Sequence, residues 1–358
     1  MNGLMRGAAM AAVLFGAGFI PASAQNFAPL PPPVATPQDV AYPGVITLEV
    51  DASDTLRGIW RARQVIPVRP GPMTLLYAEW IPGKHAPRGP INLFAGLEFR
   101  ANGEPLPWRR DPVNVYAFHL DVPAGVTEIE ARHQFVSPTA TSQGRIVSTR
   151  EMFNLNWETL LLYPSGHYAR QIRFRPSITL PEGWQFAVAL DGAETQGAVT
   201  RFADVDLETL VDSPMFAGRH FRRIDLDPGA RRPVYLNIVA DEARFLEATE
   251  EQIRPHRNLV QQSYRLFGSQ HYDHYDFLFA LSERMGGVGI EHQRSSENGV
   301  GATYFTDWDS SASERDLLPH EMTHSWNGKF RRPADMWTPN YEVPQRGRPR
   351  MNTGRSIT

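Results

Sequence analysis

The segment "HEMTHSW" at residues 320–326 constrains the chain more than any other feature, because it places two histidines four residues apart with a glutamate beside the first. On an α-helix, residues i and i+4 project from the same face, so His320 and His324 can present ring nitrogens to one ion at about 2.0–2.1 Å. Glu321 is rotated by about 100° from His320, and it can act as a general base toward a water molecule that the ion makes more acidic. The spacing therefore predicts a helix that carries half of a metal site.

The amino-acid composition narrows the choice of metal and partner. The 358 residues include no cysteine, so no disulfide or thiolate ligand can form, and any zinc ion must be held by histidine and carboxylate groups. A hydrophobic content of 42% and a charged content of 21% are typical of a globular protein, and the length suffices for two domains. The formal net charge is −3, and no long basic block precedes the last fourteen residues, which argues against nucleic acid as a partner.

The N-terminal segment has the layout of a secretory signal. In "MNGLMRGAAMAAVLFGAGFIPASAQ", one basic residue, Arg6, precedes an apolar run and then Ala22-Ser23-Ala24. We expect residues 1–24 to be a signal peptide cleaved after Ala24, which predicts a periplasmic or secreted protein without a stable membrane span after cleavage. An uncleaved anchor is the alternative, although the apolar run is short for a membrane span.

Residue patterns divide the rest of the chain into four parts. Residues 25–43 are rich in proline and read as an extended linker. Residues 44–240 show alternating apolar and polar positions with turns such as Asn102-Gly103, which predicts a β-sandwich-like domain. Residues 241–344 combine helical spacings, a buried strand at 277–282 and the helix of the histidine pair, and residues 345–358 form an atypical basic tail. The fold class predicted is α+β.

Two prolines leave the helices of the 241–344 region open to alternatives. Pro255 lies within the first helical pattern, and we expect it either to break that helix or to start a second one. Pro319 precedes the histidine pair, so the metal-bearing helix either begins at about Leu318 with Pro319 in its first turn or is kinked there.

At this point the chain resembles a known family. The strings "HEMTHSWNGKFRRPADMW" and, upstream, "GGVGIEHQRSSENG" are similar to the glycyl aminopeptidase family of zinc metallopeptidases. Members have an N-terminal β domain, a thermolysin-like catalytic domain and usually a C-terminal PDZ domain. The resemblance covers residues 241–344 well and the β domain loosely. It implies that residues 241–344 are the first part of a thermolysin-like domain.

The resemblance also implies a reaction and its residues. His320 and His324 would bind one zinc ion, and Glu321 would be the general base. Glu291, in "GIEH" at 289–292, matches the glutamate that receives the free α-amine of the substrate, and Gly289 would let the substrate backbone come close. The implied activity is hydrolysis of the peptide bond after a small N-terminal residue, glycine or alanine, in peptides or proteins with a free N-terminus.

The chain departs from the family at its third zinc ligand. A glutamate in a tryptophan-x-x-glutamate-glycine patch is expected roughly thirty residues after the second histidine, but "QRGRPRMNTGRSIT" at 345–358 has neither residue type. Glu342 is the alternative ligand, although it precedes Pro344 and the basic tail. We therefore expect that truncation or a frameshift near Gln345 leaves the catalytic domain incomplete.

Two rival hypotheses remain open. Because the third ligand is missing, the chain could be a non-catalytic polypeptide-binding or chaperone-like remnant whose metal motif is a relic. Alternatively, the same ion could serve a zinc endopeptidase, in which Glu291 would not recognise a free amine.

Overall fold

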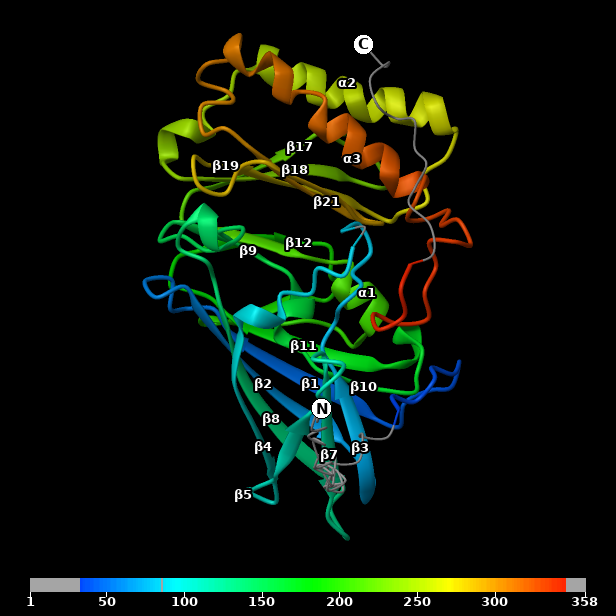
Figure 1. Ribbon diagram of the computed structural model, residues 1–358. Helices are drawn as coiled ribbons and strands as arrows, with labels where there is room; N and C mark the ends of the chain where they lie inside the picture. Colours follow the sequence, from blue (N-terminus) through cyan, green and yellow to red (C-terminus); the bar gives the residue numbers. More distant parts are fainter. Residues whose placement is uncertain (1–32, 85, 346–358) are drawn as a thin grey trace, which may run out of the picture. The chain divides into compact units, whose positions relative to one another are not determined.

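The computed structural model describes residues 33–84 and 86–345 (Figure 1). The predicted signal peptide at 1–24, part of the predicted linker and nearly all of the basic tail lie outside the described residues. Residues 33–43 contain no helix, and Gln38 forms a single β-bridge with His167.

The largest sheet is formed by strands between residues 45 and 206, in the order β13-β14-β11-β1-β2-β8-β4-β5, with β15 paired to β11. Burial alternates along its strands, as in β8, where every second residue is buried, so one face packs on the core and the other meets solvent. Its strands are β1 (Val45–Asp51), β2 (Ile59–Pro67), β4 (Phe94–Ala101), β5 (Glu104–Pro105), β8 (Glu128–Val136), β11 (Arg173–Thr179), β13 (Glu194–Gln196), β14 (Val199–Arg201) and β15 (Val205–Asp206).

Two smaller sheets complete this region. The four-stranded sheet, β10-β3-β7-β6, shares one hydrophobic core with the large sheet, which confirms the predicted sandwich-like architecture. The three-stranded sheet has the order β12-β16-β9. Their strands are β3 (Gly71–Leu76), β6 (Trp108–Arg110), β7 (Ala117–Val122), β9 (Met152–Leu155), β10 (Tyr163–Pro164), β12 (Gln185–Val188) and β16 (Met215–Gly218).

A separate five-stranded sheet has the strand order β17-β18-β19-β21-β20. The helix that contains His320 and His324 packs on it. Strands β18, β19 and β21 are parallel, and β17 and β20 are antiparallel edge strands. The strands are β17 (Phe221–Asp225), β18 (Val234–Ala240), β19 (Tyr275–Leu281), β20 (Val288–Glu291) and β21 (Ser295–Val300). The first two lie within the 44–240 range, although β18 pairs with β19 of the 241–344 range.

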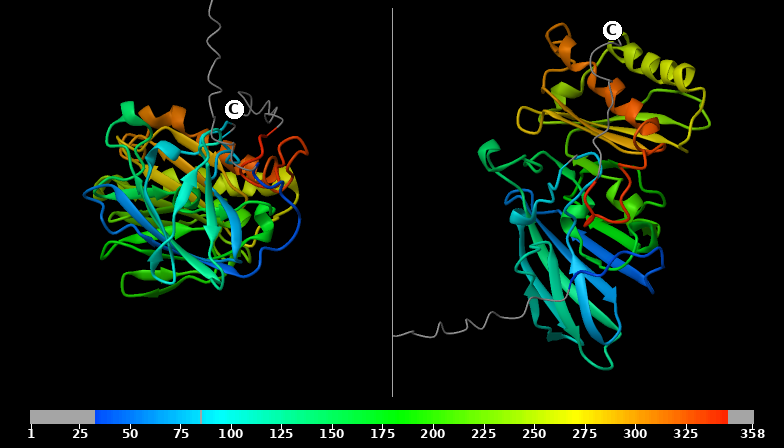
Figure 2. Two further views of the ribbon diagram at one scale, coloured as in Figure 1. Left: turned by 60° about the horizontal axis from the view of Figure 1, so that its bottom comes forward. Right: turned by 45° about the vertical axis from the view of Figure 1, so that its right-hand side comes forward.

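The central strand β19 is buried on both faces. Phe277 and Phe279 belong to a core shared with the helices, whereas Leu278 and Ala280 pack against residues of the three-stranded sheet. Because successive side chains of a strand point to opposite faces, a continuous apolar run is what a two-sided environment requires. The views from two sides show the same layers, with α2 and α3 on one side of this sheet and β9 and β12 on the other (Figures 1 and 2).

Two long helices cover the outer face of the five-stranded sheet. Helix α2 (Glu250–Phe267) begins with a capping box between Thr249 and Gln252 and runs through Pro255 without interruption, so neither alternative offered for that proline is correct. Helix α3 (Leu317–Trp326) has Pro319 in its first turn, where a missing N–H costs no helical hydrogen bond. The remaining helices are short: α1 (Leu207–Val211) and the 3-10 turns Ile91–Leu93, Thr141–Gln143, Trp157–Leu160, Ala169–Gln171, Ala243–Leu246 and Ser310–Glu314.

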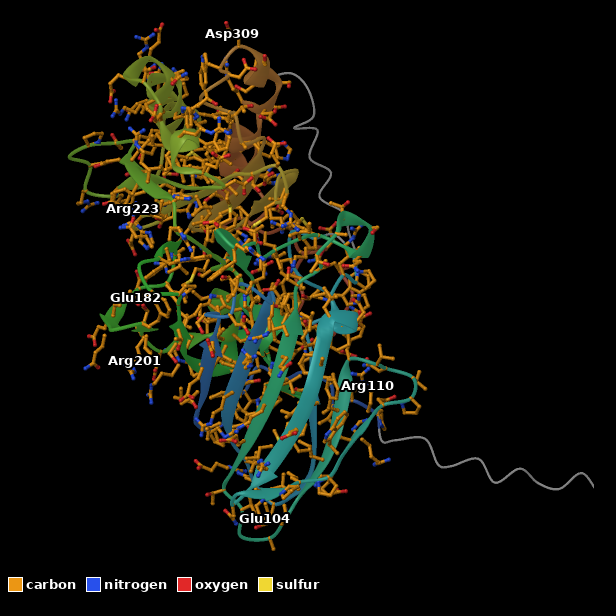
Figure 3. All side chains as sticks on the ribbon, turned by 90° about the vertical axis from the view of Figure 1, so that its left-hand side faces the viewer. Glu104, Arg110, Glu182, Arg201, Arg223 and Asp309 are labelled. Atoms are coloured by element: carbon orange, nitrogen blue, oxygen red, sulfur yellow. The ribbon has the colours of Figure 1, made fainter. Side chains whose placement is uncertain are left out.

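Many charged side chains lie at the periphery. The six labelled in Figure 3 are all exposed and project from the outer edge of the molecule: Glu104, Arg110, Glu182, Arg201, Arg223 and Asp309. Among the described residues, none of the helices combines the length and the apolar character needed to cross a membrane.

Candidate metal centre

Helix α3 is fixed against the five-stranded sheet by its last turn and its apolar face. Ser325 Oγ donates a hydrogen bond of 2.6 Å to the carbonyl of Gln293, and the Trp326 indole N–H donates one of 3.2 Å to the carbonyl of Ser269. Leu318 and Met322, four residues apart, are buried in the core. The helix therefore has one rotational setting, in which His324 is buried and His320 is exposed.

The two histidines of α3 face one another. The Nε2 atoms of His320 and His324 are 3.1 Å apart, and a carboxylate oxygen of Glu321 completes a group whose ligand atoms all lie within 4.8 Å of one another. Two nitrogens bound to one tetrahedral zinc ion at about 2.0–2.1 Å would be separated by about 3.3 Å. The two nitrogens and their spacing thus fit two of the three protein ligands of a catalytic zinc ion.

Glu321 lies against the edge strand β20. Its side chain is buried, and a Cβ atom added to Gly289 would sit only 2.2 Å from Glu321 Oε1 and 2.7 Å from Leu317 Cδ1. Glycine is required at 289 by this close approach. Burial, followed by the charge of Glu291, raises the pKa of Glu321 to about 8 in the metal-free protein.

Glu291 ends β20 and is 4% exposed. A loop from the N-terminal region reaches it, since a Cβ added to Gly83 would lie 3.4 Å from Glu291 Oε2 and 3.0 Å from Ile290. The structure thus brings the five predicted site residues onto two neighbouring elements: Gly289 and Glu291 on β20, and His320, Glu321 and His324 on α3.

Glu342 is not placed with the histidines. Its Oε1 accepts a hydrogen bond from Asn114 of the N-terminal region, and burial together with the nearby Glu79 raises the pKa of Glu342 to about 7. Among residues 33–84 and 86–345, the potential metal-binding group consists of His320, Glu321 and His324. Glu342 is therefore not the substitute ligand in this structure, because its carboxylate is held by another part of the fold.

A buried chain of charges connects β20 and α3 to the N-terminal sheets, and the sequence analysis did not identify it. His292 Nδ1 lies 3.1 Å from Asp212 Oδ1, and its Nε2 lies 3.0 Å from Glu297 Oε1. Lys329 Nζ donates to the same Asp212 oxygen at 2.6 Å. Asn154 Nδ2 donates to Glu297 Oε2 at 2.5 Å. The sequence offered one signal for these residues: His292 directly follows Glu291, and Lys329 lies five residues after His324.

These contacts shift the pKa values of the residues in this buried chain of charges. Burial opposes the charged form of His292, but its hydrogen bonds to Asp212 and Glu297 outweigh burial and raise the pKa of His292 to about 9. Burial likewise opposes the ionised form of Glu297, and His292 lowers the pKa of Glu297 to about 2. The pKa of Asp212 is lowered as well: burial alone would raise it, but the positive charge of Lys329 has the largest single opposing effect among its neighbours.

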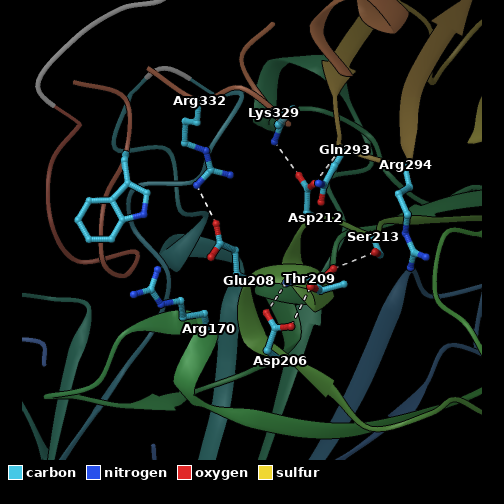
Figure 4. Close-up of a pocket in the computed structure, with 11 residues that line it drawn as sticks. Arg170, Asp206, Glu208, Thr209, Asp212, Ser213, Gln293, Arg294, Lys329 and Arg332 are labelled. Carbon is cyan, nitrogen blue, oxygen red and sulfur yellow. Dashed lines mark hydrogen bonds and ion pairs between the residues drawn. The ribbon is translucent and has the colours of Figure 1, made fainter. Parts of the chain in front are cut away.

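A charged pocket of about 380 Å³ lies beside this chain of charges (Figure 4). Its cations are ion-paired: besides Lys329 with Asp212, Arg332 Nη1 binds Glu208 Oε1 at 2.8 Å, and Arg170 and Arg294 pair with Asp39 and Asp191 outside the pocket. Trp337 meets Tyr168 edge to face at 5.5 Å between ring centroids. These contacts attach the segment after α3 to the N-terminal region, so we interpret this pocket as structural.

Comparison with known proteins gives two family matches. Residues 47–219 match the Peptidase M61 N-terminal domain, and residues 313–349 match the M61 glycyl aminopeptidase family. Together the two matches cover more than half of the chain. No curated protein matches the sequence.

Solved structures give the same fold at low identity. An aminopeptidase N family protein from Idiomarina loihiensis is 18% identical with a TM-score of 0.68, and the match covers 84% of this chain and 51% of that one. Yeast LTA4 hydrolase in complex with bestatin is 12% identical with a TM-score of 0.50, covering 81% of this chain and 44% of that one. The chain therefore spans about half the length of these structures, and the likeness confirms the α+β fold. The two family matches, together with the geometry of the histidine helix and β20, show that the chain belongs to the M61 glycyl aminopeptidase family.

Proposed function

We propose that this chain is the N-terminal and metal-binding part of an exported zinc-dependent aminopeptidase that removes small first residues, glycine or alanine, from peptides. The observation that carries the proposal is the joint placement of the histidine pair, with Nε2 atoms 3.1 Å apart, and of Glu321 against Gly289. The small-residue preference follows from the family resemblance, and export follows from the signal-like residues 1–24.

His320 and His324 would hold the zinc ion. When bound, zinc supplies Lewis-acid chemistry that polarises a carbonyl group and makes water a stronger acid. Glu321 is the nearest carboxylate, and its position supports the role of general base that accepts the proton of the attacking water. Its contact with Gly289 keeps that carboxylate beside the edge of β20, where a substrate backbone would lie.

Glu291 supports the restriction to free N-termini. Its carboxylate lies at the end of β20, two residues after Gly289, and is enclosed by the loop that contains Gly83. A buried carboxylate pairs strongly with an ammonium group, and the pair would place the first peptide bond next to Glu321. The substrate would thus be positioned for cleavage one residue from its amino end.

The test is zinc content and turnover of the complete enzyme of which this chain is a part. One zinc per chain with hydrolysis of glycyl and alanyl arylamides, abolished by Glu321→Gln with zinc retained, is the expected result. No bound zinc and no turnover, with peptide binding preserved, would favour the non-catalytic binding module. Cleavage of N-terminally blocked peptides that persists in Glu291→Ala would favour an endopeptidase.

Export is tested separately. Expression of the full sequence in a Gram-negative host should yield a periplasmic or secreted protein whose first residue is Gln25. A cytoplasmic product that retains Met1 would refute this part of the proposal.

A further inference from the structure

A second pocket, of about 710 Å³, lies along β20 on the side of the N-terminal region. Residues 287–290 form one wall, and the loop at 87–93 forms part of another. Three cationic side chains line it, Lys84, Arg88 and Arg145, and no acidic side chain is found among its described lining residues. An electropositive pocket beside the strand that carries Glu291 and Gly289 favours an anionic ligand group.

Lys84 does not supply this positive charge, because it is already paired. Its Nζ lies 2.8 Å from Glu158 Oε1, and Glu158 is 2% exposed. Arg88 is exposed to solvent, where its charge is screened. Arg145 is the remaining cation, and it is more loosely paired than Lys84, because its nearest ion-pair distance, to Glu297 Oε2, is 3.8 Å.

Arg145 has an unused hydrogen-bonding edge. Its Nη1 lies 3.8 Å from Glu297 Oε2, beyond hydrogen-bond distance, while Nε and Nη2 are buried and have no hydrogen-bond partner. Glu297 is satisfied by other groups, since His292 and two asparagines already bind its oxygens. Nε and Nη2 are the pair that receives a carboxylate side-on, through two parallel hydrogen bonds. Buried donors without an acceptor are unfavourable, and a carboxylate from a ligand would satisfy them.

Strand register sets the level of Arg145 along β20. Ile290 is directly opposite Glu297, the residue that Arg145 faces, and it lines the pocket. Ile290 lies between Gly289, which contacts Glu321, and Glu291. In the proposed function, Glu291 holds the α-amine and Glu321 acts at the first carbonyl, so the first residue of the substrate lies at this level.

We propose that this pocket receives the side chain of the substrate's first residue and that Arg145 selects a carboxylate there, so that the enzyme also acts on peptides beginning with glutamate or aspartate. The inference rests on the proposed function and extends its substrates beyond small residues, which would fill only a small part of the pocket. Arg145 is a specificity-determining residue in this proposal.

The test measures binding of two dipeptides by isothermal titration calorimetry to the zinc-free full chain, in which no hydrolysis interferes. Glutamyl-alanine and glutaminyl-alanine have nearly the same shape and differ in charge. The native chain should bind the glutamyl peptide about tenfold or more tightly, as expected for a charge-assisted bidentate pair. Arg145→Met should bring the two affinities to within about twofold, and Arg145→Lys should give an intermediate ratio because an ammonium cannot bind bidentately.

Arg88→Gln is the matched control, since it removes a cation at the exposed rim and should leave the ratio within about twofold of the native value. Thermal melting verifies that each variant is folded. If Arg145→Met does not fold, the affinity ratio of Arg145→Lys decides the outcome. A native ratio near one, or a ratio retained in the folded Arg145 variants, would overturn the inference. Failure of the proposed function gives a different result: the binding preference persists, but zinc-loaded protein does not cleave glycyl, alanyl or glutamyl arylamides.

Discussion

Substitution of Gly289 by alanine should disable the site while the zinc ligands stay in place. The added Cβ would start 2.2 Å from Glu321 Oε1, and ordinary van der Waals contact begins at 3.4 Å, so the carboxylate must retreat by the difference, about 1.2 Å. A misplacement of about 1 Å can cost about 100-fold in rate when the displaced group acts on the reacting atoms. We therefore expect kcat/KM of the complete enzyme on alanyl arylamides to fall about 100-fold, with zinc content unchanged.

The same substitution should destabilise the fold to a limited extent. Inserting a methyl group into a packed site costs about 1–3 kcal/mol, because Glu321 and Leu317 must leave their positions. Gly301→Ala is the matched control: a Cβ there would lie 3.5 Å from Glu314 Oε1, which is an ordinary contact. Urea unfolding monitored by circular dichroism gives the free energy of unfolding, and Gly301→Ala should lie within about 1 kcal/mol of the native chain.

The two variants together decide the argument. Suppose that Gly289→Ala kept an activity within about twofold of Gly301→Ala and a free energy of unfolding within about 1 kcal/mol of it. The close approach of β20 to Glu321 would then not be a property of the protein in solution. If Gly289→Ala lost its zinc as well, the carboxylate would be tied to the metal ligands more directly than the proposed division of roles allows.

The remaining predictions concern the metal, the buried charges and helix α2. His320→Ala should abolish zinc binding measured by elemental analysis yet shift the melting temperature of the zinc-free chain by no more than a few degrees, because His320 is exposed; retained stoichiometric zinc would contradict the ligand assignment. The pKa of His292 is raised to about 9 in the folded protein, so its stabilising contribution is fully present below about pH 6.5 and is lost as pH rises through 9. The free energy of unfolding, measured in urea, should therefore fall over that pH interval in the native protein and much less in His292→Gln. An equal dependence of the free energy of unfolding on pH in the two proteins would refute this. Lys329→Met should destabilise by about 3 kcal/mol or more by leaving Asp212 buried without its ammonium, and adding Asp212→Asn should recover part of that loss in a double-mutant cycle. Thr249→Ala should remove the capping box of α2 and cost about 1 kcal/mol in the same assay.

Local patterns were sufficient for several elements. The apolar run at 277–282 predicted a buried strand, and β19 has every residue buried. The four-residue spacing of His320 and His324 predicted their shared face, because helix geometry alone determines it. Helix α2 shows the limit of such reasoning: its capping box and its packed face hold the helix through Pro255, so tertiary contacts override the local preference of proline.

The sequence by itself determined the types of side chain at the site and their order on one helix and one strand, because these depend on periods of 3.6 and 2 residues. Tertiary structure decided what lies opposite them. The contact of Gly289 with Glu321, the contact of His292 with Asp212 and the attachment of Glu342 to Asn114 join residues that are 32, 80 and 228 positions apart. A pattern within one segment carries no information on such pairs, since their distance is set by how sheets and helices pack, and packing depends on all of their faces together.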